Sequence, residues 1–143
     1  MGLNTNLSYK NWDLAVVTRA NIGNYAYNNV ASSTGYLRRA TENDILTNLH
    51  SNYLNTGFVE TTENNLSDLF IENASFFKID YITLGYTLPK DTFKDISLRI
   101  YGSAQNVLTV TNYEGLDPEI TGGIDNNFYP RPRTIVFGVN IDF

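Results

Sequence analysis

The chain has 143 residues, the length of one ordinary domain, and no cysteine, which excludes a disulfide framework and a thiolate metal site. Its formal net charge of −5 argues against nucleic acid as a partner. Charged residues make up only 17% of the chain, whereas soluble domains average about 25%. No apolar run approaches the roughly 18 residues of a membrane-spanning helix, and residues 1–5 lack the basic start of a signal peptide.

Five segments alternate between two kinds of side chain with a period of two, which is the pattern of β-strands. They span residues 3–9, 12–19, 76–88, 97–108 and 133–143. Because two of the connections between them are short and the alternation repeats, we expect an all-β fold: an antiparallel meander of about five strands in which sequence neighbours pair.

The alternation also predicts which residues share a face of that sheet. One face is expected to be apolar, and the other small and polar, rich in Ser, Thr, Asn and Gly. The expected polar face includes Arg99, Tyr101, Gln105 and Asn140. The expected apolar face includes Leu14, Val16, Leu98, Ile100, Ile135, Phe137, Val139 and Ile141.

The third strand, residues 76–88, does not fit one phase of alternation. Its second half favours an apolar face of Ile82, Leu84, Tyr86 and Leu88. Its first half places Phe77, Ile79 and Tyr81 in the opposite phase. From alternation alone, a barrel with a water-filled lumen and a soluble sandwich with Asn-rich outer faces both remain open.

The connections between the five strands favour the barrel. Their lengths run short, long, short, long, as in outer-membrane barrels with periplasmic turns and extracellular loops. The first long connection, residues 20–75, is rich in Asn, and within it we expect one short helix over residues 41–54, because Ile45, Leu46, Leu49 and Tyr53 share a helical face.

Little in the sequence indicates catalysis. The one histidine, His50, lies in the Asn-rich connection and reads as a solvated loop residue, and no HExxH, Walker or GxGxxG pattern is present. Asp117, Glu119 and Asp125 fall close together, but their spacing does not match an EF-hand loop. We expect no enzyme activity, no metal site and no cofactor.

Three stretches of the second half carry a family resemblance. Residues 75–89 read SFFKIDYITLGYTLP, residues 97–120 read SLRIYGSAQNVLTVTNYEGLDPEI, and residues 129–143 read YPRPRTIVFGVNIDF. Together they strongly resemble the C-terminal end of the SusC/RagA family of TonB-dependent outer-membrane transporters. Residues 2–16, GLNTNLSYKNWDLAV, resemble the hairpin before them, and residues 20–69 match least.

The resemblance implies that residues 1–143 form the C-terminal part of an outer-membrane barrel of about 22 strands around an N-terminal plug. It implies import of oligosaccharides or peptides in Bacteroidota, with the rest of the barrel, a SusD-like surface lipoprotein, the TonB complex and membrane lipid as partners. The chain carries no plug and no TonB box, so we expect a part that cannot transport alone, with residues 20–75 as a long extracellular loop. A soluble all-β carbohydrate-binding module remains the alternative.

Two sets of candidate functional residues follow from this reading. The resemblance implies that the last strand acts as an assembly signal for the outer-membrane insertion machinery, through alternate apolar residues that end in an aromatic side chain. These residues are Ile135, Phe137, Val139, Ile141 and Phe143. Contacts to an extracellular ligand or partner are expected from Tyr113, Phe128, Tyr129 and Arg131.

Overall fold

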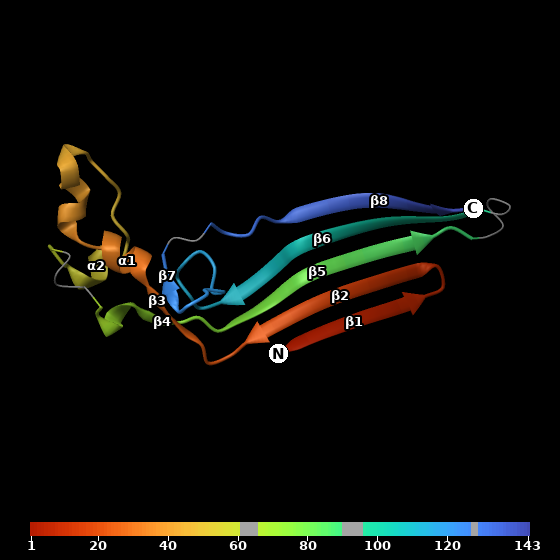
Figure 1. Cartoon of the computed structure of the whole chain (residues 1–143), viewed down its shortest axis with the longest axis horizontal. Coiled ribbons are helices and arrows are strands. Elements are labelled where there is room, and N and C mark those ends of the chain that lie inside the picture. Colours follow the sequence, from red (N-terminus) through yellow and green to blue (C-terminus); the bar gives the residue numbers. More distant parts are fainter. Residues whose placement is uncertain (61–65, 90–95, 127–128) are drawn as a thin grey trace. The chain divides into compact units, whose positions relative to one another are not determined.

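The computed structural model describes residues 1–60, 66–89, 96–126 and 129–143, except the side chains of residues 43 and 44 (Figure 1). These residues form two compact units. One, here called the sheet unit, comprises Met1–Asn21, Phe76–Val110 and Arg131–Phe143. The other, here called the loop unit, comprises Ile22–Ser75 and Thr111–Pro130.

The sheet unit is one five-stranded sheet in the order β1-β2-β5-β6-β8. The strands are β1 (Gly2–Tyr9), β2 (Trp12–Asn21), β5 (Phe76–Thr87), β6 (Ser97–Thr111) and β8 (Thr134–Asp142). The pairs β1–β2, β2–β5 and β6–β8 are antiparallel. The five strands follow each other across the sheet in sequence order, so the predicted antiparallel meander is confirmed.

A tight turn at Lys10 and Asn11 joins β1 to β2. Lys10 has a φ of 53°, in the left-handed region that residues other than glycine rarely adopt. Asn11 fixes this turn to the end of β5: its side-chain amide donates to the Thr87 carbonyl at 2.8 Å, and its own carbonyl accepts from the Thr87 N–H at 2.8 Å. The first hairpin is therefore tied to the third strand of the sheet at this end.

A β-bulge resolves the conflicting phases of β5. Val17 pairs with Tyr81, but the next residue, Thr18, pairs with Ile79, so Asp80 is an extra residue on β5. The extra residue reverses the phase of alternation along the strand. Phe77 and Ile79 therefore lie on the same face as Ile82 and Leu84, and Tyr81 lies on the opposite face, an outcome that strict alternation does not allow.

The register confirms the predicted sidedness. Across β6–β8, Ile100 faces Val139 and Leu98 faces Ile141, while Arg99 faces Asn140. Directly paired residues point to the same side of a sheet. The strands thus share one face, here called the apolar face, and an opposite polar face.

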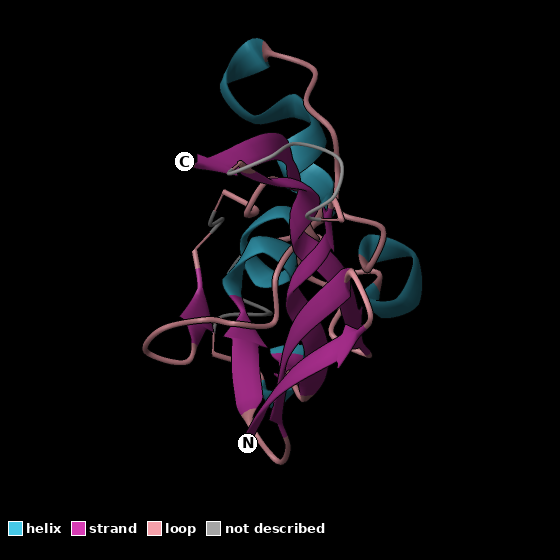
Figure 2. Cartoon of the chain, turned by 90° about the vertical axis from the view of Figure 1, so that its right-hand side faces the viewer, coloured by secondary structure: helices cyan, strands magenta, loops and turns pink. Residues whose placement is uncertain are grey.

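The loop unit holds its own small three-stranded sheet in the order β4-β3-β7, which the sequence patterns did not predict. In it β3 pairs antiparallel with β4 and parallel with β7. Figure 2 shows the short helical segments in cyan. The elements are β3 (Tyr25–Asn28), α1 (Asn29–Thr34), η1 (Leu37–Asp44), α2 (Tyr53–Thr56), η3 (Asp68–Phe70), β4 (Ile71–Asn73) and β7 (Ile124–Asp125).

The predicted helix over residues 41–54 is wrong. The 3-10 helix η1 ends at Asp44, residues 46–50 have no regular structure, and α2 begins only at Tyr53. Instead of extending a helix, the Thr47 hydroxyl donates to the Arg39 carbonyl, and the Thr47 N–H donates to the Ala40 carbonyl at 3.0 Å. Local bonding of this kind by Thr competes with helix formation. No described helix combines the length and the apolar composition needed to cross a membrane.

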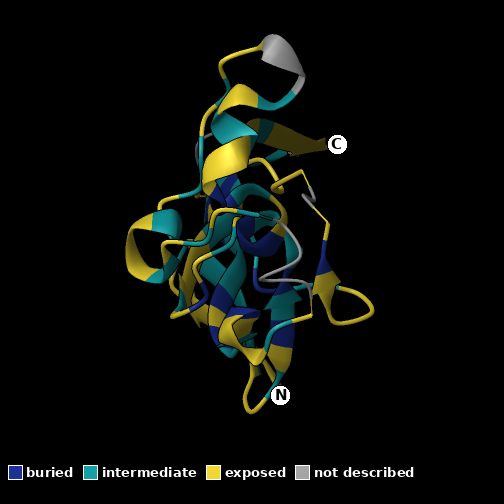
Figure 3. Ribbon diagram, turned by 90° about the vertical axis from the view of Figure 1, so that its left-hand side faces the viewer, coloured by how far each residue is buried: buried dark blue, intermediate teal, exposed yellow. Residues whose placement is uncertain are grey.

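Small side chains and a few rings make up the core of the loop unit (dark blue in Figure 3). Phe70 is only 1% exposed, and its ring packs edge-on against Tyr27 with the centroids 6.2 Å apart. At the start of α1, the Asn28 side chain accepts a hydrogen bond from the Ala31 N–H at 2.9 Å, which caps the helix. The buried residues of this core include Ala26, Ala31, Tyr36, Phe70, Ala74 and Tyr113.

Replacing Phe70 with Ala is expected to loosen the loop unit. Removing a fully buried Phe costs about 3–5 kcal/mol, because the transfer energy is lost and a cavity remains. Hydrogen exchange of the full-length protein should show faster exchange in β3 and β4 of the Phe70→Ala variant. The neighbouring exposed residue supplies the control, and Leu69→Ala should leave exchange unchanged. Equal exchange in both variants would contradict the assignment of this core.

Candidate functional site

The apolar face is exposed along all five strands. Leu7, Leu84, Ile100 and Phe137 all lie on it, and Phe137 keeps 83% of its surface accessible. In Figure 3 the strand that leads to the C-terminus is mostly yellow, the exposed class. Soluble monomers rarely expose contiguous apolar patches of more than a few hundred Å². This face is therefore suited to contact with an apolar environment.

Aromatic side chains gather at the hairpin end of this face. Trp12 pairs across the strands with Tyr9 on one side and Tyr86 on the other. The Trp12 and Tyr86 ring centroids are 4.7 Å apart, and the Lys10 ammonium lies 5.4 Å from the Tyr9 ring centroid. Rings with one polar end suit the boundary between an apolar layer and water.

An ion pair crosses three strands on the polar face. Arg99 of β6 donates from Nε to Asp13 Oδ1 at 2.9 Å and from Nη2 to Oδ2 at 2.5 Å. Asp13 lies on β2, and its register partner on the intervening β5 is Gly85. A Cβ at Gly85 would lie 2.5 Å from Asp13 Oδ1, so only glycine leaves room for this bridge. The contact also shows that Asp13, Gly85 and Arg99 share the polar face.

A second glycine makes room for Tyr101 beside this ion pair. Tyr101 of β6 faces Gly138 of β8, and a Cβ at Gly138 would clash with the Tyr101 ring, whose Cε1 would lie 2.7 Å away. The Arg99 guanidinium carbon is 5.1 Å from the Tyr101 ring centroid, within the range of a cation–π contact. Arg99 is thus held by a carboxylate on one side and a ring on the other.

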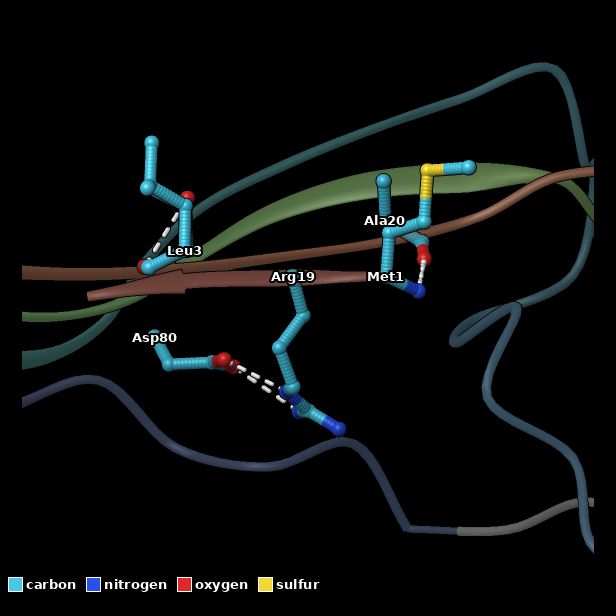
Figure 4. A network of polar contacts seen from close by, with 6 residues as sticks. Met1, Leu3, Arg19, Ala20 and Asp80 are labelled. Carbon is cyan, nitrogen blue, oxygen red and sulfur yellow. Dashed lines mark hydrogen bonds and ion pairs between the residues drawn. The ribbon is translucent and has the colours of Figure 1, made fainter.

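The bulge on β5 supplies a further ion pair. Arg19 of β2 donates from Nε to Asp80 Oδ2 at 2.5 Å and from Nη2 to Oδ1 at 2.8 Å (Figure 4). Figure 4 shows Leu3 on the other side of the strands from this pair. Bidentate pairing is the strongest geometry for an arginine and a carboxylate. The extra residue therefore carries a charge that its neighbour on β2 neutralises.

The candidate assembly-signal residues all belong to the last strand and its end. Ile135, Phe137, Val139 and Ile141 lie on the apolar face and are exposed, and Phe143 follows β8 and is fully exposed. Among the described residues, β8 pairs only with β6, so its other edge has no partner. The geometry leaves both the apolar side chains and one backbone edge of β8 accessible.

The four candidate ligand contacts fall in different environments. Tyr129 is 93% exposed and Arg131 is also exposed. Phe128 lies outside the described residues. Tyr113 is in the core, 5% exposed, and its hydroxyl donates to Asp125 at 2.7 Å. Burial raises the pKa of the Tyr113 hydroxyl, and the Asp125 carboxylate raises it further. The Tyr113 ring is therefore a structural element here and offers no surface to a ligand.

The polar residues of the connections do not assemble a metal site. Among the described residues, no group of three or more potential ligands could hold a metal ion. Asp117 accepts a hydrogen bond from the Glu119 N–H at 3.0 Å, which is the geometry of a local turn. His50 is half-buried rather than solvated, and its Nδ1 accepts a hydrogen bond from the Asn52 N–H at 3.2 Å.

The sequence patterns missed a polar network in the loop unit that is anchored on the buried Asn28. The Asn28 amide donates to Glu72 Oε1 at 2.8 Å, and Glu72 Oε2 accepts from the Glu114 N–H at 2.9 Å. These residues come from three separate stretches of the chain. Apart from the capping preference of Asn28, no short-range signal marks them, because the contacts span more than 40 residues in sequence.

The Asp13–Arg99 pair is expected to stabilise the sheet more than an ion pair on the surface does. A double-mutant cycle with Asp13→Asn and Arg99→Gln should give a coupling energy of about 1 kcal/mol, because the bond is bidentate and partly shielded. The control is the exposed pair Arg38–Glu60, whose atoms are 2.9 Å apart and whose coupling should be much smaller, because solvent screens both charges. Denaturant unfolding of the full-length protein in detergent measures both, and equal couplings would contradict the role of this bridge.

Comparison with known proteins identifies relatives over the whole chain. The TonB-dependent receptor SusC of Bacteroides thetaiotaomicron is 35% identical over 149 residues, which cover 100% of this chain and 15% of that protein. The TonB-dependent receptor P3 of Formosa agariphila is 28% identical and likewise covers 100% of this chain and 16% of the relative. No protein-family model matches the chain.

Solved structures agree with the sequence relatives. The match to the structure of the RagAB peptide transporter covers 99% of this chain and 17% of the transporter chain, with a TM-score of 0.75 and 26% identity. The RagAB peptide importer in its closed-closed state gives a TM-score of 0.77 at the same identity. The chain thus spans only about a sixth of the length of these relatives, which are receptors and transporters. It belongs to the SusC/RagA-like TonB-dependent transporters and corresponds to one segment of such a protein.

Proposed function

We propose that the chain is the C-terminal part of an outer-membrane barrel that imports oligosaccharides or peptides with energy delivered through TonB. One observation carries this proposal: all five strands present an exposed apolar face, and the opposite face is polar and braced by ion pairs. A barrel wall needs this division, because one face meets lipid and the other a polar interior. The similarity to SusC and to the RagAB peptide transporter supports import as the activity.

The partners proposed for the chain follow from the same reading. The unpaired edges of β1 and β8 would pair with the rest of the barrel, since closure removes exposed edges. A plug would fill the interior, and TonB would act through parts of the transporter outside this chain. A SusD-like lipoprotein would contact the extracellular side, to which we assign residues 20–75 and the exposed side chains of Tyr129 and Arg131.

A soluble carbohydrate-binding module fits these observations poorly. In a sandwich, the apolar face of one sheet is covered by a second sheet. Here Phe137, Leu84 and Ile100 remain exposed, and the only other sheet among the described residues has three strands of two to four residues. Tyr113, one of the rings considered for sugar stacking, is buried.

The import function is tested by deleting the gene of the full-length transporter and measuring growth on candidate glycans and peptides. The expected result is loss of growth on one cargo class, with the same loss in a strain that lacks TonB. Unchanged growth on every glycan and peptide that the wild type uses would contradict import as the function.

A lysine on the apolar face is expected to block barrel formation, whereas a lysine at the next position, on the polar face, should be tolerated. Val139→Lys would place a charge in lipid, at a cost of about 2–4 kcal/mol near the bilayer centre. Asn140→Lys puts the same charge on the polar face one residue away. Heat-modifiable migration of outer-membrane fractions measures the folded barrel. Equal amounts of folded barrel from the two variants would contradict a lipid-facing wall.

We further propose that the apolar residues of β8, together with Phe143, act as an assembly signal. An extended strand with a free edge can add to another sheet through its backbone, while alternate side chains give specificity. The face of Ile135, Phe137, Val139 and Ile141 is accessible for such recognition, and so is the edge.

Deleting Phe143 from the full-length transporter should lower the amount of folded barrel several-fold, because the terminal aromatic contact is lost while the β6–β8 pairing, which ends at Asp142, is kept. Asp142→Asn, next to it, is the control and should have no effect. The measurement is barrel content per cell by immunoblot of unheated membranes. Wild-type levels after the deletion would exclude Phe143 as part of the signal.

A further inference from the structure

The loop unit contains a cavity of about 240 Å³ that none of the proposals above uses. Its walls come from the end of β3, from α1, from the segment before α2, from residues 114–116 and from β7. Pockets for drug-sized ligands have volumes of about 300–1,000 Å³. This cavity is smaller, so it suits a single side chain rather than a whole ligand.

Two buried polar side chains, Asn28 and Asp125, contribute to the lining. Asn28 is 1% exposed and Asp125 is 4% exposed. Both are held in place: Asn28 by its bonds to Glu72 and to the Ala31 N–H, and Asp125 by the hydroxyl of Tyr113. A group that enters the cavity therefore meets a carboxylate whose position is already fixed, which lowers the entropic cost of binding.

Gly115 keeps the cavity open over this carboxylate. A Cβ at Gly115 would clash with the Tyr113 ring and would lie 2.7 Å from Asp125 Oδ2. Any larger residue would displace the carboxylate or the ring. The glycine thus lets the backbone approach closely without a side chain filling the space.

The lining is negative on its polar side. Glu114 and Asp125 contribute carboxylates, Asn28 contributes an amide and His50 an imidazole. No Lys or Arg lines the cavity in the part of the chain that the structure describes. The raised pKa of the Tyr113 hydroxyl, due first to burial and then to Asp125 and Glu72, is consistent with this negative field. An anion is therefore disfavoured.

The remaining walls are aliphatic. Val30 and Leu116 line the cavity, and no Phe, Tyr or Trp ring does among the described residues. A sugar ring would be expected to stack on an aromatic side chain. Aliphatic walls beside carboxylates instead match a side chain with a hydrocarbon stem and a positive end, as in lysine.

We propose that this cavity binds the alkyl-ammonium side chain of a lysine residue presented by a peptide. The methylene groups lie against Val30 and Leu116, and the ammonium group lies by Glu114 and Asp125. This proposal rests on the proposed import function, because it assigns a chemical preference to the extracellular side of the same transporter. It adds a side-chain specificity to the peptide class of cargo.

The test is equilibrium binding to the full-length transporter, purified in detergent without its lipoprotein. The probe is a labelled pentapeptide of glycine and serine with a central lysine, compared with the same peptide carrying norleucine, which keeps the methylene stem and lacks the charge. The lysine peptide should bind about tenfold more tightly, since a charge-assisted hydrogen bond contributes about this much.

Glu114→Gln is the main variant, because Glu114 is exposed and donates to Glu72 from its backbone N–H rather than its side chain. It should abolish most of the preference for lysine. Glu60→Gln removes the same charge elsewhere in the loop unit and should keep the preference. Asp125→Asn is a second variant, with retention of the folded barrel checked by heat-modifiable migration.

Equal affinity for the two peptides in the wild type, or an unchanged preference in both cavity variants, would overturn the proposal. A third result would also overturn the proposal. If the transporter binds both peptides equally and Glu114→Gln weakens only its complex with the lipoprotein, the cavity binds a lysine of that folded partner instead. Because this assay measures binding without transport, none of these results contradicts the import function. A failure of the import function would appear in the growth assay instead.

Discussion

The register between β2 and β5 is the constraint on which the rest of the sheet depends. Side chains alternate between faces with every residue, so a slip of one position exchanges the two faces. The extra residue Asp80 makes such a shift once, between Ile79 and Tyr81. Without it, Phe77 and Ile79 would point to the polar face. The bulge keeps the apolar face continuous along β5, and Arg19 neutralises the carboxylate that the bulge introduces.

The polar face is held together by contacts that reach past adjacent strands. Arg99 reaches Asp13 across β5 because Gly85 has no side chain between them. The Tyr101 ring lies over β8 because Gly138 beneath it has no side chain either. Glycine usually weakens a strand interior. At Gly85 and Gly138 that cost is offset by side chains that cross the sheet and couple β2, β5, β6 and β8. The polar face is thereby made stiff by its own side chains, without a second layer packed on it.

The five strands were predictable because their signal is local: period-two alternation reports the face of each residue directly. The bulge was not predictable, since one extra residue changes the phase without changing the composition. The burial of Tyr113 depends on Asp125, and the β3–β7 pairing joins Tyr27 to Ile124, contacts between residues far apart in sequence. The expected helix over residues 41–54 failed because its polar residues bond locally to the backbone, as Thr47 does.

The two units draw their stability from different sources. The loop unit buries Phe70, Tyr36 and Tyr113 within the chain, so the hydrophobic effect acts inside it. The sheet unit leaves its apolar face exposed and both outer strands, β1 and β8, with one free edge each among the described residues. Its hydrogen bonds and ion pairs define the strand order and the faces, but the burial that makes folding favourable must come from outside the sheet. In the proposed barrel, lipid on the apolar face and further strands at the two edges would supply that burial together, because a strand that enters the bilayer core needs every backbone group paired. Membrane insertion and closure of the proposed barrel would therefore be one energetic event for this sheet rather than two successive ones.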